Sequence, residues 1–450
     1  MYLGLAGGLF ATSALLAGAY FVLGGDAQAA GTPRKAPASD ARAADPGDLG
    51  TLVGRQLDAA VEVVIAGKPV AMRWSDLGVV VDEDDLAHAA RRAASDEPLA
   101  SLRDAGALPL RVDRARAIAA LTALKGRYDR AAVDARLDLE AREIRADEPG
   151  FGIDVYASLP RIESGARAGV ARLELAGVPL PARVTKAGLG IDDISHVMGH
   201  WTTKFSVSDK DRNFNLKLAA SKINGKVLAP GETFSFNEVV GNRTEKEGYK
   251  IAHVITAGEM VDGLAGGTCQ ISTTLFAASF FAGLEIVDTT PHSRPSAYQP
   301  FGFDATVVWP NTDLVLRNGY DFPVAIHYVV ARGEATVEVL GHERPYDEVT
   351  FERKILEESD YVVQERPDDT MPEGTEAIVQ PGFPGYRITR YRKFYKNGKQ
   401  VKEEHWNLNY KPVTEYVRKG TNTDPTLEVP PPPAVHELKP PSDGTGRIKQ

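Results

Sequence analysis

The chemistry that this chain can offer centres on its single cysteine, Cys269. The segment from Gly263 onward reads GLAGGTCQIS and continues as TTLFAASFFAG, so glycines precede the thiol and apolar residues follow it at helical spacing. This pattern predicts a helix with Thr268 as its N-cap and Gly283 at the C′ position that ends it. The thiol then lies in the first turn, where backbone amides and the helix dipole stabilise a thiolate and lower its pKa.

The same helix start could also bind a substrate. Its free amides would hold the oxyanion that forms when a thiol attacks a carbonyl, and neighbouring glycines would let a substrate approach the backbone closely. We therefore predict substrate contacts at Gly266, Gly267 and Thr268. A second interpretation stays open, in which Cys269 is a buried and inert structural cysteine.

A nucleophilic thiol needs a base, and the nearest downstream histidine is His292, in the segment TTPHSRP. A helix of about 14 residues carries the chain roughly 21 Å away, and about seven extended residues return it by roughly 23 Å. A strand over 284–290 would thus bring His292 to Cys269. Asp304 is the candidate that orients His292, and Arg294 is the candidate that pairs with a substrate carboxylate. Each also has a structural interpretation, since Arg294 could bridge to an acidic neighbour and Asp304 could cap a strand turn.

Composition limits the other classes of function. A single cysteine excludes an internal disulfide and argues against a structural zinc site, which needs four ligands. We predict no metal, and thiol chemistry of this kind needs no cofactor. The formal net charge of −9 argues against nucleic-acid binding. Hydrophobic and charged fractions of 43% and 25% are typical of a folded protein, and 450 residues predict several domains.

Residues 1–25 predict a membrane helix, because Leu3–Gly24 contains no charged residue and is about long enough to cross a bilayer core. The A-x-A pattern of Ala27-Gln28-Ala29 leaves a cleaved signal peptide as the alternative. The length favours an uncleaved anchor in the inner membrane, with the folded part outside the cytoplasm. Residues 26–50, rich in Gly, Ala, Pro and Asp, predict a flexible linker.

The remaining chain predicts an α+β, multidomain protein. Residues 51–190 alternate strand-like and helix-like runs, which indicates an α+β domain or two small related units. Residues 200–342 predict a central α+β domain, in which Ala305–Trp309 has the pattern of a strand.

A β-rich domain is predicted at 346–421, with a hairpin at Asn397-Gly398. The arginines and lysines of this hairpin interleave with aromatic residues, so they could bind an anionic wall polymer. The preferred interpretation is a solvent-exposed hairpin face. Residues 422–450 predict a proline-rich, disordered tail.

Four separated segments resemble the VanW family. They are NLKLAASKINGKVLAPGETFSFNEVVG at 215–241, GLAGGTCQISTTLF at 263–276, HSRP at 292–295 and FDATV at 303–307. Their order and spacing agree with the family as well. The family pattern usually has three glycines before the variable residue and the cysteine, whereas this chain has Ala265 in the first place.

The resemblance implies a protein of the bacterial cell envelope whose partner is peptidoglycan or its stem peptides. Residues 51–190 resemble, more weakly, the peptidoglycan-binding domain often found ahead of VanW units. Residues 346–421 resemble the small glycine-bearing, wall-associated domain often found behind them. Family members are associated with glycopeptide resistance, and a cysteine-dependent cross-linking role has been suggested for some.

Two functions follow as alternatives. The first is cysteine acyl transfer on stem peptides, similar to an L,D-transpeptidase, with Cys269 as nucleophile, His292 as base and Arg294 steering a carboxylate. The second is a non-catalytic peptidoglycan-binding or scaffold protein with a buried Cys269. A third, a sensor of antibiotic or redox state, has no supporting feature beyond the thiol itself.

Overall fold

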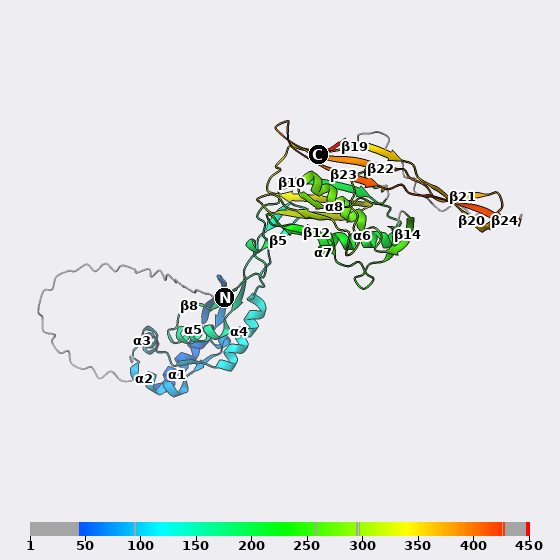
Figure 1. Cartoon of the computed structure of the whole chain (residues 1–450). Coiled ribbons are helices and arrows are strands. Elements are labelled where there is room, and N and C mark those ends of the chain that lie inside the picture. The colour runs from blue at the N-terminus through cyan, green and yellow to red at the C-terminus, as the bar shows by residue number, and fades with distance from the viewer. Residues whose placement is uncertain are drawn as a thin grey trace, which may run out of the picture.

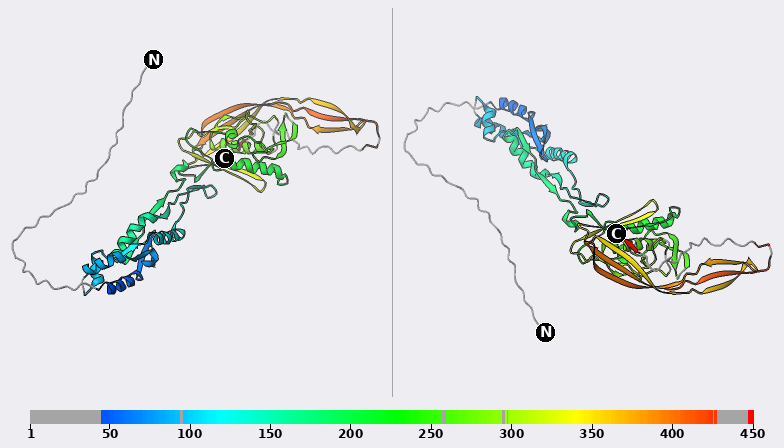
Figure 2. Two further views of the ribbon diagram at one scale, coloured as in Figure 1. Left: turned by 90° about the horizontal axis from the view of Figure 1, so that it is seen from below. Right: turned by 90° about the horizontal axis from the view of Figure 1, so that it is seen from above.

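The computed structural model describes residues 45–93, 96–256, 259–293, 296, 298–424, 426–427 and 447–450. Within these ranges the chain forms an N-terminal α+β unit, a central α+β unit and a β-rich C-terminal unit (Figure 1). The expectation of an α+β, multidomain protein with a β-rich C-terminal region is confirmed. Both views in Figure 2 show an elongated molecule with the N-terminal and C-terminal units at opposite ends.

The predicted membrane helix at 1–25 lies outside the described residues, and the anchor stays a prediction. Among the helices that the structure does describe, none is long and apolar enough to span a membrane. The predicted linker extends too far, because a helix already begins at Pro46. Asp45 caps this helix by accepting a hydrogen bond from the Gly47 amide at 2.7 Å, and proline is well suited to a first helical position.

The N-terminal unit alternates helices with short strands. Its helices are α1 (Pro46–Leu57), α2 (Glu83–Arg92), α3 (Pro98–Asp104), α4 (Arg114–Tyr128) and α5 (Val155–Arg167). Its strands are β1 (Ala60–Ile65), β2 (Lys68–Arg73), β3 (Val79–Val81), β4 (Leu110–Val112), β5 (Arg136–Asp138), β6 (Glu143–Arg145), β7 (Gly150–Ile153), β8 (Arg172–Glu174) and β9 (Gly177–Leu180). Strand β1 pairs with β2 as a hairpin and with β8 in parallel. These elements bury their apolar faces in a core of their own.

The central unit is built around one helix, α8 (Thr268–Ala282). The other helices are α6 (Lys210–Ile223) and α7 (Phe236–Val240). The strands are β10 (His196–Lys204), β11 (Val227–Leu228), β12 (Thr233–Ser235), β13 (Ile251–Thr256), β14 (Glu259–Leu264), β15 (Glu285–Asp288), β16 (Val315–Arg317), β17 (Val324–Ala331) and β18 (Glu334–Gly341). One sheet has the order β10-β18-β17-β11, and another has the order β12-β16-β15.

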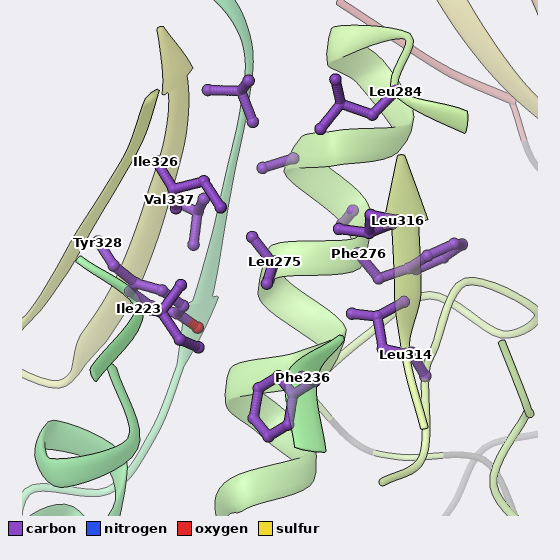
Figure 3. Close-up of a cluster of buried hydrophobic side chains, with 14 of the residues drawn as sticks. Ile223, Phe236, Leu275, Phe276, Leu284, Leu314, Leu316, Ile326, Tyr328 and Val337 are labelled. Carbon is purple, nitrogen blue, oxygen red and sulfur yellow. The ribbon is translucent and has the colours of Figure 1, made fainter. Parts of the chain in front are cut away.

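Helix α8 lies between these two sheets, as Figure 3 shows. Leu275 faces Ile326 and Val337 of the larger sheet, whereas Phe276 lies toward Leu316 of the smaller one (Figure 3). Every residue of α8 except Cys269 is buried. Its polar side chains are buried as well, and those of Gln270 and Thr274 have hydrogen-bond partners. Cys269 is therefore the place where this core helix meets the surface.

The C-terminal unit is a long, twisted pair of sheets. Its strands are β19 (Glu348–Ser359), β20 (Val363–Pro372), β21 (Glu376–Gln380), β22 (Gly385–Lys396), β23 (Lys399–Tyr410), β24 (Glu415–Asn422) and β25 (Arg447–Lys449). The sheet nearer the central unit has the order β23-β22-β19-β25, and the distal one has the order β20-β24-β21. The predicted hairpin is confirmed, with Asn397 and Gly398 at φ 52 and 71° as a primed turn requires.

Two predictions for this part of the chain are wrong. The hairpin face is not wholly exposed, because Arg390, Arg392 and Phe394 are each 0% exposed and pack on the central unit. The tail is not disordered at its end, because β25 pairs with β19. The part of the tail at 428–446 lies outside the described residues.

The segment Ala305–Trp309 is not the predicted strand, and only Val308 makes a bridge, to Thr312. Side chains of α8 instead donate hydrogen bonds to the backbone carbonyl groups of this segment. Ser272 Oγ donates to the Ala305 carbonyl at 2.7 Å. Since these backbone groups already have partners, the segment lies across the start of α8 without joining a sheet.

Candidate active site

The first turn of α8 carries Cys269, as predicted. Its N-cap is Gly267 and not Thr268, whose hydroxyl donates to the Ala265 carbonyl at 2.6 Å. The backbone passes through left-handed conformations here, with φ of 62° at Ala265 and 102° at Gly267. This tight entry places the thiol at the positive end of the helix dipole, where a thiolate is stabilised.

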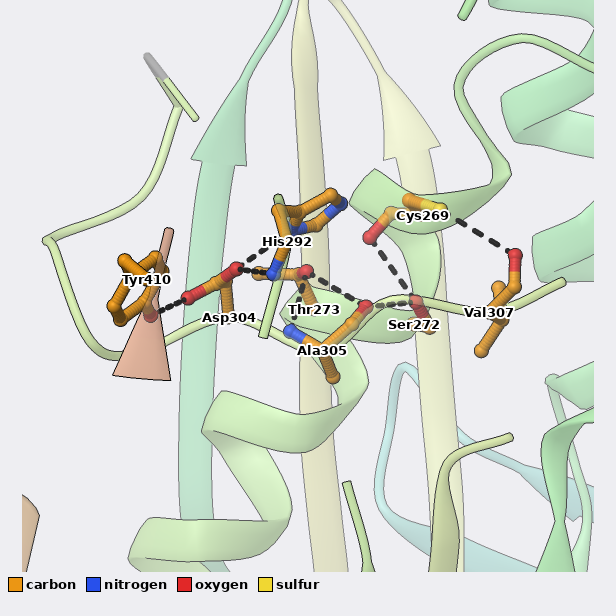
Figure 4. A network of polar contacts seen from close by, with 8 residues as sticks. All are labelled: Cys269, Ser272, Thr273, His292, Asp304, Ala305, Val307 and Tyr410. Carbon is orange, nitrogen blue, oxygen red and sulfur yellow. Dashed lines mark hydrogen bonds and ion pairs between the residues drawn. The ribbon is translucent and has the colours of Figure 1, made fainter. Parts of the chain in front are cut away.

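Cys269 is partly buried and faces the segment that crosses the helix start. Its thiol donates to the Val307 carbonyl at 3.5 Å, a contact that only the protonated form can make. Strand β15 carries the chain back along the helix, so that His292 lies beside Cys269 (Figure 4). The two residues that the spacing argument paired are thus brought together.

Asp304 holds His292 in place. His292 Nδ1 and its backbone amide both contact Asp304 Oδ2, at 2.6 and 2.7 Å. The side chains of His292 and Asp304 are only 5% and 4% exposed. A carboxylate can only accept, so Nδ1 carries the proton of this bond and Nε2 faces the thiol (Figure 4). Cys269, His292 and Asp304 thus have the relative arrangement of a nucleophile, a base and an orienting acid.

The pKa values of Asp304, His292 and Cys269 are all shifted, and the contacts among these residues are among the causes. Burial raises the pKa of Asp304, but hydrogen bonds and the charge of His292 outweigh it and keep that carboxyl below its usual range. Burial lowers the pKa of His292, but Tyr298, Asp304 and Cys269 hold it well above its usual value. Burial raises the pKa of Cys269, but a hydrogen bond and the charge of His292 bring it below the ordinary value. These directions favour a thiolate–imidazolium pair.

The predicted substrate contacts lie at the helix start, but Arg294 lies outside the described residues. Gly266 is held through its carbonyl, which accepts from Asn215 Nδ2 at 3.2 Å. Gly267 and Thr268 flank the thiol directly in sequence. The substrate roles of these residues stay predictions. Within the described ranges, no group of three or more His, Cys, Asp or Glu side chains is placed to hold a metal ion.

Two arginines near the thiol were missed from the sequence. Arg212 Nη2 donates to Gln270 Oε1 at 2.8 Å, and its stem would contact a Cβ at Gly267. Arg243 is 9% exposed, and its Nη1 donates to Asn237 Oδ1 at 2.6 Å. Burial raises the thiol pKa, and the charge of Arg243 is a smaller cause that lowers it, after His292 and the Val307 contact. No local pattern distinguishes these arginines from surface residues.

Tyr410 was also missed, because it belongs to the C-terminal unit. Its hydroxyl donates to Asp304 Oδ1 at 2.6 Å, the oxygen that His292 leaves unused. Figure 4 shows Tyr410, Asp304 and His292 in one chain of contacts that ends beside the thiol. No sequence signal near Tyr410 links it to a residue in another unit.

Residues 211–340, which include Cys269, His292 and Asp304, match the family model described as VanW like protein. The chain carries a VanW-like domain. Residues 348–422 match the model described as G5 domain. The family resemblance found in the sequence is confirmed, and the β-rich unit that follows the VanW-like domain is a G5 domain.

Two curated relatives match the VanW-like domain. The uncharacterized protein YoaR of Bacillus subtilis (strain 168) is 46% identical over 129 residues, which are 29% of this chain and 43% of that protein. The vancomycin B-type resistance protein VanW of Enterococcus faecalis (strain ATCC 700802 / V583) is 33% identical over 120 residues, which are 26% of this chain and 44% of that protein. The chain thus spans less than half the length of these relatives.

Two solved structures resemble the G5 domain. The IgA1 protease G5 domain is 21% identical, with a TM-score of 0.12, and covers 17% of this chain and 96% of its own length. The HP0197 G5 structure is 19% identical, with a TM-score of 0.10, and covers 16% of this chain and 97% of its own length. These TM-scores are low, and neither likeness adds to the family match.

Proposed function

We propose that this protein acts at the bacterial cell envelope, binds peptidoglycan, and transfers acyl groups between stem peptides through Cys269. The observation that carries the proposal is the arrangement of the partly buried Cys269 with the buried His292 and Asp304 at the start of α8. The match to a VanW-like domain and a G5 domain supports the setting at the envelope. One relative is named as a vancomycin resistance protein, which is consistent with this setting.

The reaction would have two steps, formation of a thioester on Cys269 and transfer of the acyl group to an acceptor amine. The Cys269 thiolate attacks a stem-peptide carbonyl, and the amides of the first helical turn stabilise the oxyanion. His292 then gives its proton to the leaving amine as the carbon–nitrogen bond breaks and a thioester remains. An acceptor amine attacks the thioester, its proton passes to neutral His292, and the thiolate leaves. Arg294 is proposed to pair with a substrate carboxylate, as the sequence suggested.

A thioester adduct is the direct test. Wild-type protein and the Cys269→Ser variant are incubated with purified stem peptides, and intact mass is measured. We expect a mass increase equal to the acyl fragment in the wild type and none at that mass in Cys269→Ser. A matched control is Ser279→Ala, which removes a hydroxyl of the same helix that has no hydrogen-bond partner among the described residues.

The alternative is a non-catalytic wall-binding or scaffold protein. It predicts that Cys269→Ser and wild type bind insoluble peptidoglycan equally and that neither forms an adduct. It also predicts that a thiol reagent labels Cys269 only after unfolding. Rapid labelling of the native protein together with an adduct would exclude this alternative, and equal product yields from both forms would exclude the enzymatic proposal.

A further inference from the structure

The G5 domain reaches into the site of the VanW-like domain through Tyr410, the last residue of β23. The Tyr410 hydroxyl is 2.6 Å from Asp304 Oδ1, while His292 occupies Oδ2. Tyr410 is 1% exposed and Asp304 is 4% exposed. A carboxylate buried to this degree is stable only if donors surround it. Tyr410 supplies one of those donors.

Tyr410 bears on the charge of Asp304. Burial raises the pKa of this carboxyl, and the hydrogen bond from Tyr410 is among the contacts that lower it, together with those from His292. An ionised Asp304 in turn helps to hold the pKa of His292 well above its usual value. The hydroxyl of the G5 domain therefore connects, through Asp304, to the imidazole that faces Cys269.

A second residue of the same sheet adds a positive charge. Arg390 of β22 is fully buried, and its guanidinium nitrogens have no hydrogen-bond partner among the described residues. It packs on the rings of Phe276 and Trp406, at 4.7 and 4.8 Å from their centroids. Burial lowers the pKa of Arg390 to about 10, so it remains a cation at neutral pH, and Asp304 is one of the charges that favour this cation.

We propose that Tyr410 is a positioning residue for His292, acting through Asp304, so that the G5 domain completes the reactive site of the VanW-like domain. The G5 sheet would then be part of the catalytic unit as well as a separate family module. An effect of Tyr410 on acyl transfer rests on the proposed function. An effect of Tyr410 on His292 and on the Cys269 thiol does not. The reactivity of the Cys269 thiol can be measured whether or not the protein transfers acyl groups.

The test compares Tyr410→Phe with Tyr386→Phe in the full chain. Tyr386 is the cross-strand partner of Tyr410 and is also buried, but its hydroxyl donates to Glu358. The rate of Cys269 alkylation by iodoacetamide is followed from pH 5 to 10. In Tyr410→Phe the rise of the rate should move to higher pH, with alkylation at pH 7 about five- to tenfold slower. Tyr386→Phe should keep the wild-type profile.

A double-mutant cycle separates positioning from general support. Because Tyr410 acts through Asp304, Tyr410→Phe should change nothing further in an Asp304→Asn background. All four proteins of the cycle are compared below the unfolding transition of the least stable variant. A Tyr410→Phe profile that superimposes on wild type, or an equal further loss in the Asp304→Asn background, overturns the inference. If wild type shows a shifted thiol profile but forms no thioester with stem peptides, the proposed function fails and the role of Tyr410 stands.

Discussion

At the scale of single residues, the site favours a pair of opposite charges where each charge alone would be unstable. Burial opposes the charged form of both Cys269 and His292. Each nevertheless shifts toward its charged form, because a nearby opposite charge and a shared hydrogen bond outweigh desolvation. The two shifts favour the thiolate–imidazolium pair over the neutral pair, in which the thiol donates to the Val307 carbonyl.

Removing His292 tests this pairing. In His292→Gln, burial of Cys269 acts without its counter-charge, so the thiol pKa should rise above that of an ordinary cysteine. Alkylation by iodoacetamide at pH 7 should slow by at least about tenfold and recover only in alkaline solution. His327→Gln is the matched control, because His327 Nδ1 also pairs with a carboxylate, that of Glu338 at 3.2 Å. An unchanged profile in His292→Gln would contradict the charge pair.

At the scale of elements, the entry into α8 decides where the thiol lies. Gly267 has φ of 102°, and a Cβ there would lie 3.2 Å from Arg212 Cγ and from Leu216 Cδ2. A glycine thus lets α6 approach the turn and lets the chain enter the helix with Cys269 in its first turn. A side chain at this position would be strained by its backbone conformation and crowded by its neighbours.

Gly267→Ala should therefore lower the free energy of unfolding by roughly 1–3 kcal/mol, measured in urea. It should also slow alkylation of Cys269, because the turn that presents the thiol must shift. Gly231→Ala is the control, since Gly231 has φ of 76° but open space around its Cβ position. The control should cost about 1 kcal/mol and leave thiol reactivity unchanged. Equal behaviour of the two variants would show that the close approach of Arg212 has no effect.

At the scale of the whole molecule, the VanW-like and G5 domains share one core. Phe351 of β19 and Phe394 of β22 belong to the same buried cluster as α8. Arg392 Nη1 donates to the Phe280 and Leu284 carbonyls at the end of α8, at 3.1 and 2.8 Å. The N-terminal unit has a separate core, and only a small cluster lies between it and the larger sheet of the VanW-like domain.

Calorimetry should therefore show two unfolding transitions, one for the N-terminal unit and one for the other two domains together. Arg392→Met removes a buried donor to the Phe280 and Leu284 carbonyls and also removes an ion-pair partner of Glu404. It should lower only the second midpoint, by roughly 5–10 °C for a loss of about 3 kcal/mol. Leu121→Ala, at a fully buried position of α4, should lower only the first. A G5 transition that separates from that of the VanW-like domain would contradict the shared core.

Much of the site could be predicted from local sequence. The apolar spacing after Cys269 and the stop at Gly283 predicted α8 to within a residue, because a helix repeat is read directly from side-chain type. Chain length then limited how far His292 could lie from the thiol. The predicted strand at Ala305–Trp309 failed, because a strand also needs a neighbour to pair with, and here α8 side chains take that place.

Which element covers each face of a strand or helix depends on tertiary packing. The alternation along β22 was consistent with an exposed hairpin, yet Arg390 and Arg392 face the aromatic core of another domain. The hydrogen bond between Tyr410 and Asp304 joins residues 106 positions apart, beyond the reach of any local pattern. Periodicity in a sequence reports which side of an element is apolar and where a reactive group can lie. Which segment buries that side is determined only when distant parts of the chain pack together. In this protein that packing affects the charge of Asp304 and, through it, the reactivity of Cys269.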